Sequence, residues 1–268
     1  DPLPEIQRLK EENLSLQAER NTLLAELGLT EGDLENTPLC SLCGDTGYRG
    51  GQMCRCLKAY YVEEERKELS KLLDLGGQSF DTFELDWYSP DRGSLPRSPR
   101  ENAQRNLNLC RDFAARFRPG RENLLLYGAP GLGKTFLSAC IARVVSEDGF
   151  SVVYDTAGHV FSQFESAKFR RDDDGDTAGE DVERCMNCDL LILDDLGTEM
   201  TTSFVQSALY QLINGRLLTG KSTVISTNLD PEELGRRYGA PLLSRLEGEY
   251  QLLPFVGTDI RRLKREQG

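Results

Sequence analysis

The sequence contains no apolar run long enough to cross a lipid bilayer, and no secretory signal opens the chain. We therefore expect a cytoplasmic protein without a membrane partner. Positive charge is also scarce, because 32 lysine and arginine residues stand against 44 aspartate and glutamate residues, for a formal net charge of -12. This balance argues against a protein that coats duplex DNA through bulk charge, so any nucleic-acid contact must be a local patch.

Cysteine, in contrast, is well represented, with eight residues in a chain of 268. In a cytosolic protein of this size, metal ligands and buried thiols are expected more than disulfides. The length accommodates one full α/β domain and a smaller attachment. We expect an N-terminal helix over 1–37, a cysteine module with a following helix over 38–78, and a main domain over 79–268.

The strongest motif runs from residue 128 to 135, Gly-Ala-Pro-Gly-Leu-Gly-Lys-Thr, and matches every fixed position of the GxxxxGK[ST] phosphate loop. An apolar strand is expected before it, over 123–127, and a helix after it, over 136–146. The loop and the helix N-terminus would aim backbone N–H groups at the phosphates of ATP or ADP. Lys134 would reach the β and γ phosphates, and the Thr135 hydroxyl would coordinate Mg²⁺. The expected nucleotide-binding residues are Gly128, Ala129, Pro130, Gly131, Leu132, Gly133, Lys134, Thr135 and Phe136.

The second strong motif is the apolar run 190–193, which ends in the paired carboxylates Asp194 and Asp195. In a parallel sheet, the carboxyl end of this strand would deliver both carboxylates to the mouth of the phosphate loop. We expect Asp194 in the Mg²⁺ shell and Asp195 as the group that orients and deprotonates the attacking water. The segment 223–227 has the pattern of another buried strand of the same sheet, which would place Asn228 near the γ phosphate and the water.

Four cysteines form a Cys-x-x-Cys pair and a Cys-x-Cys pair around a short glycine-rich loop: Cys40, Cys43, Cys54 and Cys56. Such pairs can bring four thiolates to the corners of the tetrahedron that Zn²⁺ prefers. Four unrelated thiols would instead be reactive groups in an unprotected polar loop, so we favour zinc. Because protein would fill all four positions, we expect the metal to fold a small recognition module and not to catalyse.

The first helix, over 5–27, carries an apolar stripe at heptad spacing. It either pairs with a partner protein or folds back on a second helical pattern over 57–75, and we favour the intramolecular hairpin. The stripe consists of Ile6, Leu9, Leu16, Leu23 and Leu27, interrupted by Asn13 and Arg20.

Between residues 76 and 100 we expect a linker whose aromatic side chains dock on the next domain, with the nucleotide base as one possible location. The acidic run 172–183 predicts a solvated loop, and Cys185 and Cys188 predict buried thiols. The remaining patterns predict helices over 101–116, 159–169, 231–246 and 259–265, and strands over 151–154 and 250–255.

These motifs occur in the order seen in AAA+ ATPases: phosphate loop, apolar strand ending in two aspartates, strand ending in Asn228, Ser244-Arg245, and Gly257 to Arg261. Over residues 79–268 the chain resembles the bacterial helicase-loader branch of the DnaC/DnaI type, with which the IstB transposition helpers are grouped. The most specific pieces are the segment 193–197 with Glu199 close behind, and the segment 244–246.

The resemblance implies an α/β fold: an AAA+ domain with a central parallel sheet, helices on both faces and a short C-terminal lid, preceded by a small helical zinc-binding module. It also implies that Asn228 is the sensor 1 residue and that Arg245 is an arginine finger inserted into a neighbouring subunit. Arg261 corresponds to sensor 2, with Arg262 as the adjacent alternative. The cysteine module resembles the part of DnaI-type loaders that grips the replicative helicase, and IstB-type proteins are not expected to carry it.

We therefore expect an ATP-hydrolysing loader that delivers a hexameric replicative helicase onto single-stranded DNA during replication initiation or restart. The alternatives are a transposase helper of the IstB type that acts on duplex DNA, a P-loop metabolite kinase, and a zinc adaptor that binds nucleotide without turnover. Asp195 stands where many AAA+ ATPases carry glutamate, and its shorter arm predicts slow turnover.

Overall fold

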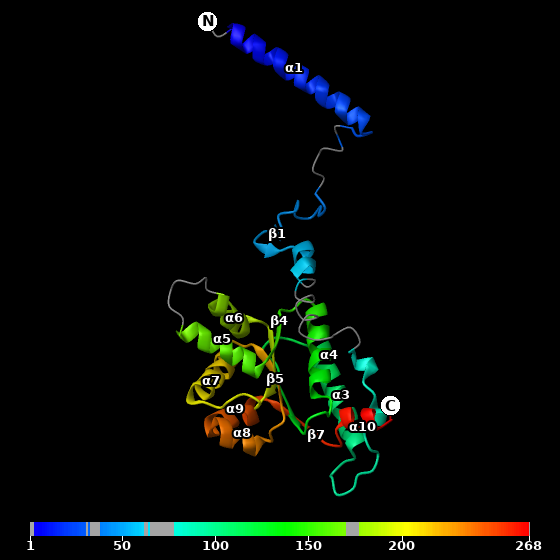
Figure 1. The fold of residues 1–268 in the computed structure, drawn as a ribbon, viewed down its shortest axis with the longest axis vertical. Helices are drawn as coiled ribbons and strands as arrows, with labels where there is room; N and C mark the ends of the chain where they lie inside the picture. Colours follow the sequence, from blue (N-terminus) through cyan, green and yellow to red (C-terminus); the bar gives the residue numbers. More distant parts are fainter. Residues whose placement is uncertain are drawn as a thin grey trace. The chain divides into compact units, whose positions relative to one another are not determined.

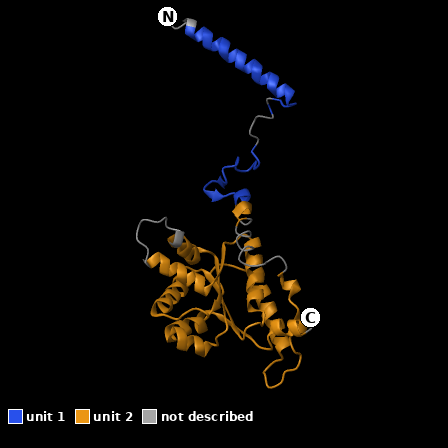
Figure 2. Ribbon diagram, viewed as in Figure 1, with its two compact units in different colours: residues 1–57 blue, residues 58–268 orange. Residues whose placement is uncertain are grey.

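The computed structural model describes residues 3–30, 32, 38–61, 64, 78–169 and 177–267. The chain divides into two compact units, residues 1–57 and 58–268 (Figure 2). Of the helix expected over 57–75, residues 57–61 are helical and most of the rest lies outside the described residues. The predicted boundary at residue 37 and the acidic segment 172–176 lie outside them too. None of the helices described is both apolar and long enough to span a bilayer.

The first unit contains one long helix and one short hairpin. Helix α1 runs over Leu3–Glu26, and the antiparallel strands β1 (Tyr48–Arg49) and β2 (Gln52–Met53) form the hairpin. Gly50 and Gly51 connect the strands with φ angles of 57° and 81°. Two positive φ angles in a row are typical of the tight turn that matches the twist of paired strands, and glycine adopts them without steric cost.

The second unit is built on a parallel sheet of five strands: β3 (Leu124–Gly128), β4 (Val152–Thr156), β5 (Leu190–Leu196), β6 (Ser222–Thr227) and β7 (Gln251–Phe255). Their order across the sheet is β4-β5-β6-β3-β7. The three central strands β5, β6 and β3 are buried along most of their length because helices cover both faces. Since all five strands point the same way, their carboxyl ends share one edge.

Two layers of helices enclose this sheet (Figure 1). On one face, α3 (Pro99–Ala115) and α4 (Lys134–Glu147) pack on Leu124, Leu126 and Ile192. On the other face, α5 (Ala157–Phe169), α6 (Thr177–Asn187), α7 (Ser203–Leu218), α8 (Pro231–Tyr238) and α9 (Ala240–Glu249) pack on Leu125, Leu191 and Ile225. The predicted α/β fold, with a central parallel sheet and helices on both faces, is confirmed.

Two helices differ from the sequence-based expectation. The segment 177–183, expected as a solvated loop, is the start of α6, because Cys185 and Met186 just beyond the acidic run supply the apolar face that packs on the core. Helix α7 was not predicted at all, although Thr202 caps it by accepting a hydrogen bond from the backbone N–H of Val205. Cys185 and Cys188 are buried, as expected.

One buried cation joins three elements of the main unit. Arg216 on α7 is fully buried, and its guanidinium donates to the carbonyl oxygens of Cys185 (2.7 Å) and Cys188 (3.1 Å) at the end of α6. It also donates to the Ser222 carbonyl (2.5 Å) and the Thr223 hydroxyl (3.0 Å) on β6. The cation therefore satisfies carbonyls that the C-terminus of α6 leaves without helical partners.

We predict that R216M lowers the free energy of unfolding by about 3–5 kcal/mol, because several buried carbonyl groups lose their donors. R216K is expected to be destabilising as well, since an ammonium group lacks the planar set of donors. Urea denaturation measures both. R184M, which changes an exposed arginine on α6, is the control and is expected to stay within about 0.5 kcal/mol of the wild type; equal stability of R216M and R184M would contradict the assignment.

Candidate nucleotide-binding site

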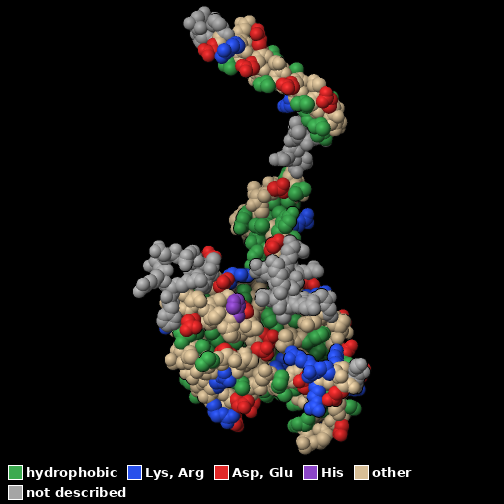
Figure 3. Space-filling model, viewed as in Figure 1, with side chains coloured by type: hydrophobic (Ala, Val, Ile, Leu, Met, Phe, Trp, Pro, Cys, Tyr) green, Lys and Arg blue, Asp and Glu red, His purple; other side chains and the backbone are tan. Residues whose placement is uncertain are grey.

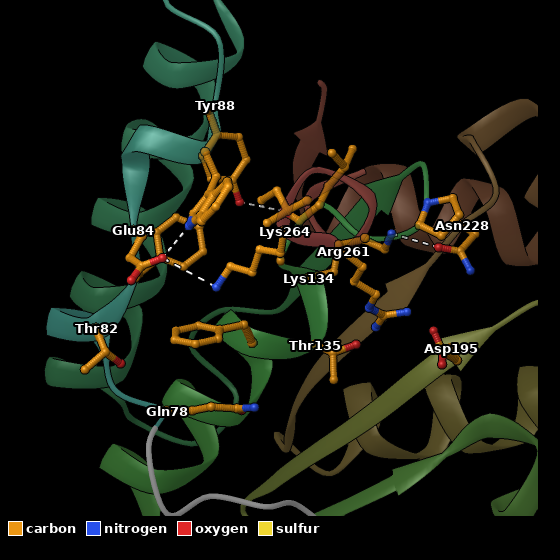
Figure 4. Close-up of a pocket in the computed structure, with 18 residues that line it drawn as sticks. Gln78, Thr82, Glu84, Tyr88, Lys134, Thr135, Asp195, Asn228, Arg261 and Lys264 are labelled. Atoms are coloured by element: carbon orange, nitrogen blue, oxygen red, sulfur yellow. Dashed lines mark hydrogen bonds and ion pairs between the residues drawn. The ribbon is translucent and has the colours of Figure 1, made fainter. Parts of the chain in front are cut away.

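The phosphate loop connects β3 to α4, and its glycines are required by close contacts. Gly133 is the N-cap of α4 with a φ of 88°, and a Cβ there would lie 2.8 Å from the Tyr88 hydroxyl oxygen. A Cβ at Gly131 would lie 1.8 Å from an oxygen of Asp259. The loop borders a cavity of about 360 Å³, whose lining residues Figure 4 shows.

Lys134 lies at the bottom of this cavity and is 5% exposed. Its Nζ atom donates to the carbonyl oxygens of Gly128 (2.6 Å) and Ala129 (2.8 Å) and to Oδ1 of Asn228 (2.8 Å). Burial lowers the pKa of Lys134 to about 8, and Asp195 and Asp194 partly oppose this shift. The two residues predicted to contact the γ phosphate, Lys134 and Asn228, are therefore in direct contact.

Asp194 is buried at the carboxyl end of β5, and hydroxyl groups surround its carboxylate. Tyr154 on β4 donates to Oδ2 at 2.6 Å, and Ser226 on β6 donates to Oδ1. The Thr135 hydroxyl lies 3.4 Å from Oδ1. Carboxylate and hydroxyl oxygens are ligands that Mg²⁺ accepts, so Thr135 and Asp194 fit the predicted role, and Tyr154 and Ser226 would orient Asp194 from behind.

Asp195 reaches the cavity through an irregularity in β5. Side chains of consecutive strand residues point to opposite faces, which would separate Asp194 from Asp195. The pairing of β5 with β6 shifts register between Leu193 and Leu196, and Asp195 has a φ of 53°. Its side chain lines the cavity, and burial together with the neighbouring Asp194 raises its pKa. A carboxylate with a raised pKa is a better proton acceptor than a fully solvated one.

The C-terminal helix α10 (Ile260–Gln267) closes one side of the cavity. The Ile260 N–H donates to the Gly131 carbonyl at 3.0 Å, so the helix begins directly against the phosphate loop. Arg261 lines the cavity (Figure 4), whereas the exposed Arg262 pairs with Glu266 at 2.8 Å. Of these two arginines, Arg261 is therefore the one positioned to meet a γ phosphate.

Aromatic side chains form the opposite wall. Phe83 stacks on Tyr88 with ring centroids 5.7 Å apart and lies 5.5 Å from the ring of Phe136. The Tyr88 hydroxyl donates to the Leu132 carbonyl at 2.9 Å, which ties this wall to the phosphate loop. These planar, apolar surfaces fit a nucleotide base, so the linker aromatics dock on the main unit as expected.

An ion pair spans the mouth of the cavity and was not anticipated from the sequence. Lys264 on α10 lies 3.4 Å from Glu84 and 5.2 Å from the centre of the Trp87 ring, and Trp87 donates to the same glutamate. Both charged residues are exposed, so the contact is weak. Tyr154 and Ser226 were missed too, because a hydroxyl inside a buried strand carries no signal of its own.

Arg245 is an exposed residue of α9 and is not among the residues that line the cavity. The structure thus brings together the phosphate loop, Asp194, Asp195, Asn228 and Arg261, and leaves Arg245 outside. An arginine finger acts on the site of a neighbouring subunit, so an exposed position is what that role requires.

The four predicted cysteine ligands also converge, within the first unit. Their sulfur atoms lie within 4.8 Å of one another, with Cys40 and Cys54 at 3.8 Å and Cys43 and Cys56 at 3.4 Å. A tetrahedral site with Zn–S bonds of about 2.3 Å requires sulfur atoms about 3.8 Å apart. Backbone N–H groups of Leu42 and Cys43 lower the pKa of Cys40 to about 6, whereas the hydrogen bond with Cys43 raises the pKa of Cys56 to about 12, so Cys40 is the thiol of this cluster that ionises first. The residues therefore fit a structural zinc site.

Comparisons with known proteins agree with this geometry. The family described as IstB-like ATP binding protein matches residues 102–262, more than half of the chain. The uncharacterized protein YdaV of Escherichia coli K12 is 28% identical over 140 residues, which cover 52% of this chain and 55% of YdaV. The replicative helicase loader DnaC of the same strain is 24% identical over 146 residues, which cover 54% of this chain and 58% of DnaC. The chain thus spans little more than half the length of these curated relatives.

Among solved structures, the crystal structure of the DnaC helicase loader superimposes with a TM-score of 0.52 and 23% identity. The match covers 66% of this chain and 98% of that structure, and it shows a shared fold.

The lowered pKa of Lys134 predicts how nucleotide binding depends on pH. The ammonium group is charged below a pKa of about 8 and loses its proton above it, so ATP affinity should fall as the pH rises through 8. Between pH 7 and pH 9 we expect the dissociation constant to increase about tenfold. Calorimetric titration at several pH values measures this.

The control for this titration is K134R, whose guanidinium stays charged over the whole range. Its affinity should be lower but nearly independent of pH. A flat profile for the wild type, or the same slope in both proteins, would contradict the role given to Lys134.

The cysteine geometry predicts about one zinc ion per purified chain, measured by elemental analysis. C43A should reduce the metal content to near zero and unfold the hairpin of β1 and β2, because structural zinc supplies the folding energy of such small modules. C185A, which removes a buried thiol of the other unit, should keep the zinc. Full metal content in C43A would refute the site.

Proposed function

Because the chain belongs to the family of IstB-like ATP binding proteins, as its motifs predicted, we propose that it is an ATP-dependent loader of the replicative DNA helicase. It would work in the cytoplasm and deliver the helicase onto single-stranded DNA during replication initiation or restart. The observation that carries this proposal is one cavity lined by the phosphate loop, Asp195, Asn228 and Arg261, with Asp194 3.4 Å from the Thr135 hydroxyl of that loop.

The residues of this cavity can take separate roles in ATP hydrolysis. Backbone N–H groups of the loop and Lys134 bind the phosphates, and Asp195 orients a water and accepts its proton. Thr135 and Asp194 are the side chains that would hold Mg²⁺, which neutralises phosphate charge when it is bound. When Lys134 turns to the phosphates, its hydrogen bond to Asn228 breaks. Asn228 then becomes available to the water or the γ phosphate.

Arg245 supports a mechanism that needs more than one subunit. It is exposed and lies outside its own cavity, so it can act only on the cavity of a neighbour. ATP would then order subunits side by side, and hydrolysis would weaken that contact and release the helicase. The short side chain of Asp195 holds water at a greater distance than glutamate would, which suits a slow switch.

The cysteine cluster favours helicase loading over the second candidate, a transposase helper acting on duplex DNA. The family match supports both candidates. Cys40, Cys43, Cys54 and Cys56 would hold Zn²⁺, which cross-links the module when bound, and such a module suits the recognition of a partner protein. The acidic chain limits its contact with single-stranded DNA to local stacking and a few basic side chains.

The proposal is tested with the full chain and the replicative helicase of the same organism. We expect the helicase to be retained on immobilised protein in the presence of ATP, and single-stranded DNA to stimulate ATP hydrolysis more than duplex DNA does. No association in either nucleotide state would overturn helicase loading. Stimulation by duplex DNA alone would favour the transposase helper.

We further predict that R245A lowers the rate of ATP hydrolysis by about three orders of magnitude, as expected for an arginine finger. Mixing R245A with K134A should restore part of the rate, because each variant supplies the group that the other lacks. R236A removes another exposed arginine, on α8, and should have little effect. A metabolite kinase active as a monomer would show no recovery in the mixture.

A further inference from the structure

Helix α1 presents an apolar seam to solvent. The side chains of Ile6, Leu9, Leu16, Leu23 and Leu27 are between 52% and 71% exposed. They fall on the first and fourth positions of a heptad, called a and d, together with Asn13 and Arg20 at two a positions. Figure 3 shows hydrophobic side chains on the surface of this helix between charged ones. A seam of this spacing buries itself against another helix of the same period.

The charges beside the seam select the direction of that second helix. On one flank, heptad position g holds only glutamate: Glu5, Glu12, Glu19 and Glu26. On the other flank, position e holds Lys10, Gln17 and Leu24. In a parallel pair of identical helices, each g residue faces the e residue five positions further along the partner, so Glu5 and Glu12 face lysine and glutamine, while Leu24 is 8% exposed and packed within its own chain. In an antiparallel pair the glutamate flanks would face each other and repel.

Asn13 gives an independent argument for the same direction and register. Within one helix its Oδ1 atom accepts a weak hydrogen bond from the exposed Gln17, at 3.3 Å. In a parallel, in-register pair Asn13 lies opposite Asn13 of the second copy, and the two amides can satisfy each other. In an antiparallel pair it would lie opposite a leucine and stay unsatisfied. Asparagine at one a position is a known determinant of paired, in-register helices.

Arg20 is compatible with this arrangement. A side chain at an a position of a parallel pair packs against the g residue that precedes the same position on the partner. That residue is Glu19 of the second copy, so the arginine gains an opposite charge.

We propose that α1 pairs with α1 of a second copy of this chain as a parallel, in-register, two-stranded coiled coil. The pairing needs no nucleotide. It would hold two ATPase units at high effective concentration before ATP places Arg245 of one unit at the cavity of another. It uses a surface separate from the nucleotide cavity and does not depend on the proposed helicase.

The first test is sedimentation equilibrium of the full chain without nucleotide, over a concentration series, with R245A as background to remove contacts through the arginine finger. We expect a monomer–dimer equilibrium. L16E, which introduces a charge at a d position, should weaken the dimer by about a hundredfold or more. L14E is the matched control, since Leu14 is 56% exposed and lies off the seam; it should dimerise like the background.

A monomer at every concentration would overturn the proposal. If the protein were monomeric and L16E also lost helix content, α1 would pack within its own chain as the intramolecular hairpin. Equal dimerisation of L16E and L14E would overturn the seam as the interface.

The second test concerns direction. E5K and K10E each create like-charge pairs in a parallel dimer, so each should weaken it about fivefold, since every dimer contains the pair twice. The double variant E5K/K10E should regain most of the loss. E5K also breaks the pair between Glu5 and Arg8 within the helix (3.9 Å), which the double variant does not restore; its recovery therefore reports the contact between chains. A stronger dimer in E5K would show an antiparallel pair and refute the proposed direction.

Discussion

The arrangement of the nucleotide site depends on one buried carboxylate. Asp194 has almost no access to water, and an unpaired carboxylate there would be costly. Hydroxyl groups from three other elements compensate this cost: Tyr154 on β4, Ser226 on β6 and Thr135 on α4. They meet only if the parallel strands keep their register, since a slip of one residue would turn Tyr154 to the other face of the sheet. The same hydrogen bonds that satisfy Asp194 therefore lock the strand alignment on which the site depends.

The parts of the molecule that the sequence predicts well are those whose chemistry lies in consecutive residues. The phosphate loop, the run 190–195 and the cysteine pairs carry their spacing with them, and apolar strands of a doubly covered sheet read as continuous runs. Tyr154 and Ser226 could not be found in this way, because their role appears only when β4 and β6 flank β5, and strand order is a property of the whole fold. The start of α6 was misjudged because its first residues are acidic and its anchoring side chains come later.

The motif named Asp194 and Asp195 without predicting the backbone geometry that brings both side chains to the site. The motif predicted that Asp194 and Asp195 both reach the phosphate loop, yet a regular strand would send them to opposite faces. The register shift in β5 and the left-handed backbone at Asp195 resolve this conflict. The backbone N–H of Asp195 donates to Ser226 Oγ at 3.1 Å. Ser226 therefore contacts both the carboxylate of Asp194 and the backbone of Asp195. Such irregularities are common beside active sites and leave no signature in composition.

Two segments that are far apart in the sequence form the walls of the cavity. One wall is the linker segment 78–88, through which the chain enters the main unit, and the other is α10 at its C-terminal end. They are joined by Lys264 and Glu84, an exposed pair worth little free energy, and the Ile260 N–H of α10 donates to the Gly131 carbonyl of the phosphate loop. Under the proposed function, a triphosphate bound between these walls would pair with Arg261 on α10. Nucleotide binding would then act on the linker and on α10 together, because both line the same cavity.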